Sequence, residues 1–137
     1  MNAIADTGFV VAVANRRDRN HSICRRIHDE QTSLMALPQS ILAESAYLMT
    51  TEGGNIFTGR FLMGLSQSIF RLLPLEPVDI QRTAELLMEY ADSRLDFVDA
   101  TVVTIAERLN ITRVLTLDQR DFRMMRPRHC EYFEILP

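Results

Sequence analysis

Lysine is absent from this chain of 137 residues, so all 15 of its basic residues are arginines. The absence of lysine excludes chemistry that requires a lysine amine, including that of phosphate-accepting receiver domains, which need a lysine beside their aspartates. Arginine binds phosphate through planar, bidentate contacts, although the base composition of a genome also produces all-arginine chains. The net charge of −3 argues against binding of polyanions by the charge of the whole chain.

Cysteine and histidine are scarce. Cys24 and Cys130 lie far apart in the sequence and form no CxxC motif, so we expect reduced thiols. The three histidines form neither an HExxH motif nor a cluster with cysteine, and a zinc site therefore has little support.

Long hydrophobic runs are also missing. None approaches the ~20 residues of a membrane-spanning helix, and Asp6 interrupts the N-terminal apolar stretch where a signal segment would have to continue. We therefore expect a cytoplasmic protein with no membrane partner. A content of 47% hydrophobic and 24% charged residues is typical of a globular protein, and the length predicts one domain over residues 1–137.

Short apolar runs alternate with amphipathic segments along the chain. We predict strands at 2–6, 33–37, 71–75, 114–117 and 132–136. We predict helices at 8–15, 20–31, 38–53, 55–70, 77–92 and 96–110, with Pro38 as the first residue of the third, and a short helical or irregular stretch at 118–125. This alternation favours an α/β fold with a central, mostly parallel sheet flanked by helices.

Two carboxylates follow predicted buried strands. Asp6 ends the apolar run 3–5, and Asp118 ends the run 114–117. In a parallel sheet, binding sites form outside the carboxyl ends of the strands, and neighbouring strands lie ~4.8 Å apart. Both side chains should therefore point into one crevice.

Two further acids are placed by helical spacing. Asp99 shares a face with Val103 and Ala106, whereas Thr101 and Thr104 are expected on the opposite side. We therefore expect Asp99 near one edge of the buried stripe.

Glu44 shares its helix face with three large apolar residues, Ile41, Tyr47 and Leu48, which predicts that it too faces inward.

Each acid taken alone has a simpler explanation. Asp6 is compatible with a helix N-cap, Asp118 and Asp121 with caps of the turn that follows the strand, and Glu44 with an arginine ion pair. Asp99 is the hardest to explain in this way, because its helix is expected to begin earlier. The joint pattern is better explained by a shared cation.

Several carboxylates held close together repel one another unless a cation or a proton offsets their charge. Ligands that are all oxygen favour Mg²⁺, with Mn²⁺ as the alternative. Such a site suits the hydrolysis of a phosphodiester by a metal-activated water.

Four motifs carry a family resemblance: Ala5-Asp6-Thr7-Gly8, Leu42-Ala43-Glu44, Asp96-Phe97-Val98-Asp99-Ala100, and the segment from Leu115 to Phe122, which contains Asp118 and Asp121. In order and spacing the chain resembles the PIN-domain nucleases, and within them the VapC-type ribonuclease toxins of toxin–antitoxin pairs. The resemblance implies a PIN-like fold and a Mg²⁺- or Mn²⁺-dependent endoribonuclease site. It also implies a homodimer and a cognate antitoxin whose C-terminal segment packs over the cleft.

The resemblance assigns roles to the residues that match the motifs. Asp6 and Asp99 match the metal ligands, Glu44 the second catalytic acid, and Asp118, or alternatively Asp121, the fourth acid. Thr7 and Thr116 match hydroxyl positions beside the site, and Asp96 matches a less constant acid. A housekeeping PIN nuclease and a non-catalytic PIN module that binds RNA or protein remain alternatives, whereas a DxDxT phosphatase is excluded by Gly8.

Two features outside the motifs bear on partners. Arg120 is the strongest candidate for a phosphate contact, because it follows the last acidic motif. Segment 55–70 carries Phe57, Phe61, Leu65 and Ile69 on one face, which is compatible with a dimer or antitoxin surface and equally with the core.

Overall fold

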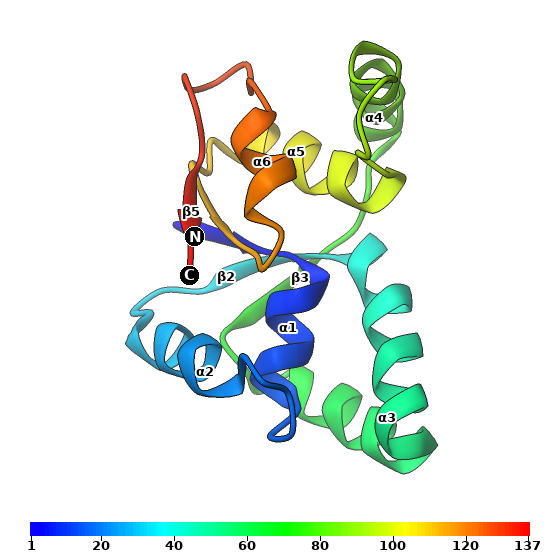
Figure 1. Ribbon diagram of the computed structural model, residues 1–137, viewed down its shortest axis with the longest axis vertical. Helices are drawn as coiled ribbons and strands as arrows, with labels where there is room; N and C mark the ends of the chain where they lie inside the picture. The colour runs from blue at the N-terminus through cyan, green and yellow to red at the C-terminus, as the bar shows by residue number, and fades with distance from the viewer.

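Five parallel strands form a single sheet at the centre of the molecule (Figure 1). The computed structural model describes residues 1–137. In spatial order the strands are β3 (Phe70–Leu73), β2 (Met35–Pro38), β1 (Ala3–Ala5), β4 (Arg113–Leu115) and β5 (Glu134–Leu136). The prediction of an α/β fold around a mostly parallel sheet is confirmed.

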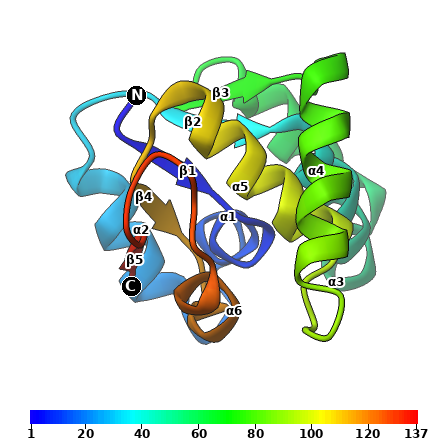
Figure 2. The ribbon, with the colours of Figure 1, turned by 90° about the horizontal axis from the view of Figure 1, so that it is seen from above.

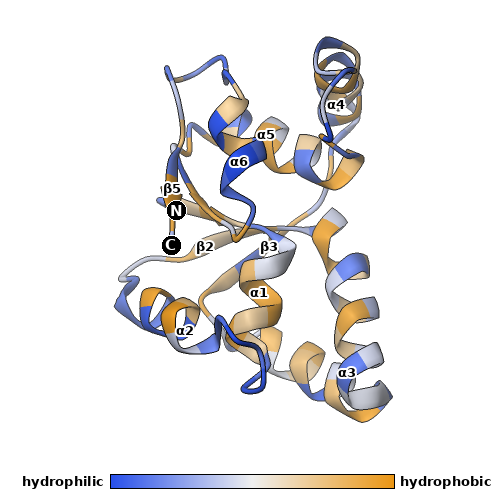
Figure 3. Ribbon diagram, in the orientation of Figure 1, coloured by the Kyte–Doolittle hydropathy of each residue, from blue (hydrophilic) through white to orange (hydrophobic).

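Six helices cover the two faces of the sheet. On one face lie α1 (Thr7–Ala14), α2 (His21–Glu30) and α3 (Gln39–Leu65), and on the other α4 (Pro77–Glu89), α5 (Phe97–Leu109) and α6 (Gln119–Met124). Hydrophobic residues gather in the sheet and on the helix sides that face it, whereas the turn after α1 and much of α6 are hydrophilic (Figure 3). None of these helices combines the length and the hydrophobicity that crossing a bilayer requires.

The central strand, β1, positions the first acid. It pairs with β2 on one side and β4 on the other, and Ala5 lies opposite Leu115. All three of its residues are buried, and the Asp6 backbone N–H donates to the Leu115 carbonyl at 2.9 Å. Asp6 therefore leaves the sheet at its carboxyl end, as the sequence predicts.

Most element boundaries differ from the prediction by a few residues, and two of these differences bear on the site. β4 ends at Leu115 rather than 117, because the Asp118 N–H donates to Thr116 Oγ1 at 2.9 Å and this local bond turns the backbone away from the sheet. Pro38 is extended, with φ −59° and ψ 134°, and closes β2, so α3 begins one residue later at Gln39.

Helix α3 is bent at Gly54. This residue has φ 76° and ψ −179°, outside the helical region, and it divides the helix where the sequence predicted one helix to end and another to begin. Only glycine adopts this backbone conformation readily. The second half of α3 consequently runs in a different direction from the first (Figure 1).

Helix α5 is buried on nearly all sides, which corrects the expectation that Thr101 and Thr104 face outward. Every residue from Ala100 to Ala106 is buried, because α5 lies over the sheet while α4 packs along its other side (Figure 2). The Thr104 hydroxyl lies 3.1 Å from the Thr83 hydroxyl of α4 and donates to the Ala100 carbonyl at 2.9 Å. Such bonds to the preceding turn let threonine enter a helix interface.

Candidate metal centre

An open cleft at the carboxyl ends of the strands brings the predicted acids together. It is lined by 11 residues: Asp6, Thr7, Gly8, Glu44, Leu48, Arg94, Asp96, Asp99, Leu117, Asp118 and Asp121. All four predicted catalytic acids lie in it, although they come from four separate segments of the chain. Of the predicted supporting residues, Thr116 lies behind the cleft and Arg120 beside it.

Asp6 is the most enclosed of the four acids. It caps α1, with Oδ1 accepting from the Thr7 N–H at 2.8 Å and Oδ2 accepting from Thr116 Oγ1 at 3.0 Å. The proposed cap is therefore real, and it coexists with a place in the cleft. Burial raises the pKa of Asp6 to about 6 against the effect of these two bonds, and the nearby charges of Glu44 and Asp118 raise it further.

Asp99 lies in the first turn of α5, which begins two residues earlier at Phe97, in agreement with the expected helix start near residue 96. Asp96 is the N-cap of α5, and its Oδ1 accepts from the Asp99 N–H at 2.9 Å. In return, Asp99 Oδ2 accepts from the Asp96 N–H at 3.3 Å. This reciprocal capping box fixes Asp99 at the cleft wall. Burial raises the pKa of Asp99 to about 8, and the charges of Asp6 and Asp96 add to the effect.

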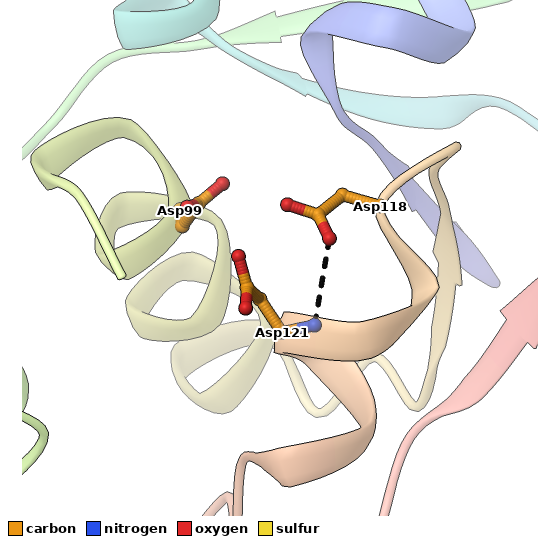
Figure 4. Close-up of side chains that lie close together, drawn as sticks. All are labelled: Asp99, Asp118 and Asp121. Carbon is orange, nitrogen blue, oxygen red and sulfur yellow. Dashed lines mark hydrogen bonds between the residues drawn. The ribbon is translucent and has the colours of Figure 1, made fainter. Parts of the chain in front are cut away.

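Asp118 and Asp121 face Asp99 across the cleft. Carboxylate oxygens of the three residues lie within 4.8 Å of one another, and Figure 4 shows the side chains pointing toward a common space. Asp118 is the N-cap of α6, and its Oδ1 lies 3.4 Å from the Asp121 N–H. Burial, followed by the neighbouring Asp121, raises the pKa of Asp118. Both candidates for the fourth acid therefore reach the same space.

Glu44 is exposed, and the prediction that it faces the core is wrong. The core side of α3 carries Ile41, Ser45 and Met49, whereas Tyr47 is 71% exposed. Of the three large apolar residues that suggested a buried face, Ile41 is buried, whereas Tyr47 and Leu48 point outward. Glu44 nevertheless lines the cleft, and it forms no ion pair.

Thr7 presents a buried hydroxyl without a partner. The residue is 4% exposed, it lines the cleft, and its Oγ1 forms no hydrogen bond within the protein. A buried hydroxyl left unpaired costs about 1–3 kcal/mol. The Thr7 hydroxyl at the wall of the cleft is therefore available to a bound ligand.

The donor set fits a hard divalent cation. Every acid in the cleft offers carboxylate oxygens, and no histidine or cysteine lines it. Burial and the neighbouring carboxylates raise the pKa values of Asp6 and Asp99, so a bound cation would favour their ionised forms. Oxygen ligands of this kind favour Mg²⁺ or Mn²⁺.

Arg94 is the cleft residue that sequence reasoning missed. It lies in the turn between α4 and α5, two residues before Asp96, and its charge lowers the pKa of Asp118. Its position immediately before an acidic motif was the available signal.

A second, larger groove lies away from the acids. It runs between α1, α2 and the second half of α3 and contains none of the predicted site residues. Phe57, Phe61, Leu65 and Ile69 line it while packing against the core, so the predicted apolar face of segment 55–70 is only partly buried.

The fold and the cleft together define an α/β protein with a candidate divalent-cation site at the carboxyl end of its sheet. Residues 3–126 match the model of the PIN domain, and the chain therefore belongs to the PIN domain family. It is 26% identical to Ribonuclease VapC26 of Mycobacterium tuberculosis over 134 residues, which covers 98% of this chain and 99% of that protein.

Two solved structures share this fold. The crystal structure of Mycobacterium tuberculosis VapC20, described as a toxin that cleaves the sarcin–ricin loop, matches with a TM-score of 0.79 and 19% identity over 86% of this chain and 91% of that one. A toxin–antitoxin complex from Klebsiella pneumoniae matches with a TM-score of 0.70 and 18% identity over 96% and 98% of the two chains.

Proposed function

We propose that residues 1–137 act as one PIN domain, a Mg²⁺- or Mn²⁺-dependent endoribonuclease that is the toxin of a VapBC-type pair. The observation that carries the proposal is the convergence of Asp6, Asp99 and Asp118 in one cleft with raised carboxyl pKa values. Membership of the PIN family and similarity to a protein named as a ribonuclease support it.

The acids of the cleft have different roles in this proposal. Asp6 and Asp99 hold the cation, and the third ligand comes from Asp118 or Asp121, whose oxygens lie beside those of Asp99. When bound, the cation polarises a phosphoryl oxygen and lowers the pKa of an attacking water.

The remaining cleft residues orient the reacting groups. Thr116 fixes one oxygen of Asp6, and the unpaired hydroxyl of Thr7 is placed to donate to a phosphate oxygen. Glu44 has no polar partner within the protein, so its carboxylate is free to accept the proton that the attacking water loses.

Replacement of the proposed ligands tests the function. Asp6→Asn and Asp99→Asn should each reduce Mn²⁺-dependent RNA cleavage by at least about 100-fold, since changes to residues that only support a metal ligand already cost roughly 10–100-fold. EDTA should stop the wild-type protein, and Glu52→Gln, an exposed acid of α3 outside the cleft, should cleave normally. RNA cleavage that survives both Asn substitutions would refute the proposal.

The toxin role requires protein partners. Leu48, 39% exposed, lines the cleft, and Tyr47, 71% exposed, precedes it on the same helix. Together they offer apolar surface for an antitoxin segment that covers the acids. Co-purification with the product of a short neighbouring reading frame should inhibit cleavage, and Tyr47→Glu should restore it. Full activity in the presence of that product would favour a housekeeping nuclease.

We also propose a homodimer, for which exposed apolar residues in the second half of α3 provide a surface. Ile56 and Met63, seven residues apart and therefore on one helix face, are 72% and 81% exposed. Light scattering of the purified protein should give twice the chain mass of 15.7 kDa, and Ile56→Asp should give the monomer mass. A monomeric wild-type protein would exclude the dimer without affecting the nuclease assignment.

A further inference from the structure

The acid cleft poses an electrostatic problem for a polyanionic substrate. Six carboxylates line it, and Arg94 is the only cationic side chain among them. When these acids are ionised, their charges outnumber those of Arg94 and one divalent cation together. A phosphodiester strand therefore needs positive charge at the cleft rim to approach the acids.

The environment of Arg94 leaves its guanidinium available. Five other arginines, namely Arg25, Arg82, Arg108, Arg113 and Arg128, form ion pairs with carboxylates. Arg94 forms none, although its charge is felt by Asp118. A guanidinium that is close enough to influence the acids yet unpaired has unused capacity for a bidentate contact with phosphate.

The backbone on both sides of Arg94 is held in place. The Ser93 hydroxyl donates to the Tyr90 carbonyl at 2.7 Å and accepts from the Leu95 N–H at 3.1 Å. The Tyr90 hydroxyl in turn accepts from the Arg126 N–H at 3.0 Å, which ties the turn to the segment after α6. A fixed backbone limits the entropy lost when the side chain of Arg94 binds a ligand.

A further pocket continues from the acid cleft past Arg94. It is lined by the end of α4, the α4–α5 turn and α6, and it shares Arg94 and Asp121 with the acid cleft. Its lining includes three carboxylates, those of Glu89, Asp92 and Asp121. Arg120 supplies its other cation and also forms no ion pair, while Tyr90 and Met124 add surface on which a base can pack. Arg94 and Arg120 are the two cations of a pocket that otherwise carries carboxylates, and their unpaired guanidinium groups are therefore the groups that can bind successive phosphates of a single strand.

We propose that Arg94 binds the RNA phosphate next to the one that is cleaved, and that Arg120 binds a phosphate farther along the same strand. Single-stranded RNA then runs from the acid cleft through the pocket between the α4–α5 turn and α6. The inference rests on the proposed ribonuclease function, since it assigns the path of that substrate.

Binding without turnover tests the path. The probe is a fluorescein-labelled single-stranded RNA of 12 random nucleotides, bound in Mn²⁺ to protein carrying Glu44→Gln and followed by anisotropy. In this background Arg94→Ala should raise the Kd about tenfold. The plot of the logarithm of the association constant against the logarithm of salt concentration should become less steep by about 0.7, the value for one phosphate contact on a single strand. Arg94→Lys should keep the salt slope but recover only part of the affinity.

Probes of two lengths and a matched control variant distinguish the proposed RNA path from non-specific attraction to positive charge. Arg120→Ala should weaken the 12-nucleotide probe but not a trinucleotide, which is too short to extend past Arg94. Arg17→Ala removes an exposed arginine beyond the opposite end of α1 and should change neither value. An effect of Arg17→Ala equal to that of Arg94→Ala, or no effect of Arg94→Ala, would overturn the proposal.

The binding experiment and the cleavage experiment test the RNA path and the nuclease assignment separately. If wild-type protein cleaves RNA and Arg94→Ala binds the probe normally, the path is wrong and the nuclease stands. If wild-type protein cleaves no RNA while Arg94→Ala loses affinity, the path stands as a binding surface and the nuclease assignment fails.

Discussion

At the scale of single residues, Thr116 links the acids of the cleft. This fully buried residue donates its hydroxyl proton to Asp6 Oδ2 at 3.0 Å and accepts from the Asp118 N–H at 2.9 Å. One side chain therefore orients a proposed metal ligand and also shapes the turn that presents the fourth acid. Such support is needed because a carboxylate that rotates freely binds a cation less well.

Loss of the Thr116 hydroxyl should weaken the metal centre. Thr116→Val keeps the shape of the side chain but removes both hydrogen bonds, and we expect Mn²⁺ affinity measured by calorimetry to fall by roughly 10–100-fold. Thr116→Ser keeps the hydroxyl and should stay within a few-fold of wild type. Equal affinities for the Val and Ser variants would show that Thr116 serves packing alone.

At the scale of elements, backbone conformation and helix packing decide where the acids lie. The bend of α3 at Gly54 separates the half that carries Glu44 from the half that lines the larger groove. On the other face, α5 is enclosed between the sheet and α4, and the ion pair of the buried Asp79 with Arg108, at 2.9 Å, joins these two helices. The capping box that holds Asp99 therefore lies at the first turn of a helix that packing and this ion pair hold in place.

The positive φ of Gly54 predicts a specific sensitivity. Gly54→Ala should lower the free energy of unfolding by about 1–3 kcal/mol, because a side chain is strained in this backbone conformation even though the space around it is open. Gly59→Ala, in the same helix, also in open space but at a helical φ, should be neutral or stabilise by up to about 1 kcal/mol. Urea denaturation of both variants measures the difference, and equal effects would contradict it.

At the scale of the whole molecule, the acid cleft makes stability depend on pH and on metal. The folded-state pKa values of Asp6 and Asp99, about 6 and about 8, lie above the 3.8 expected when the groups are free. Between these values the folded protein holds more protons than the unfolded chain, so the contribution of both groups is fully present below about pH 4 and is lost as the pH rises toward 8. Cation binding should offset this loss.

Comparison of wild type with Asp99→Asn isolates this effect from other titrating groups. In EDTA, the stability of Asp99→Asn relative to wild type should rise steadily from pH 5 to pH 8, as measured by thermal or urea unfolding, because the variant has no carboxylate to ionise. At one fixed concentration, Mn²⁺ should stabilise wild type more at pH 8 than at pH 6. When the Mn²⁺ concentration is 100 times the Kd at the pH used, the free energy of unfolding should rise by about 2.7 kcal/mol. Glu52→Gln serves as the control, and a pH-independent difference between wild type and Asp99→Asn would contradict the prediction.

The sequence predicted the alternation of elements and the placement of Asp6 after a buried strand. These features are local, because an apolar run followed by a carboxylate predicts a buried strand that ends at an acid, wherever that strand lies in the sheet. The separation of two helices near Gly54 was predicted for the same reason, since the conformational freedom of glycine is a property of that residue alone.

The sequence by itself therefore determined which segments become strands and helices, and that acids stand at several of their ends. Only the tertiary structure decided that Glu44 is exposed, that Thr101 and Thr104 are buried, and that Arg94 reaches the cleft. Helical spacing identifies residues that share a face, but neighbouring elements determine which face is covered. Segments distant in sequence meet only when the chain packs, and packing is what places Asp99 opposite Asp118.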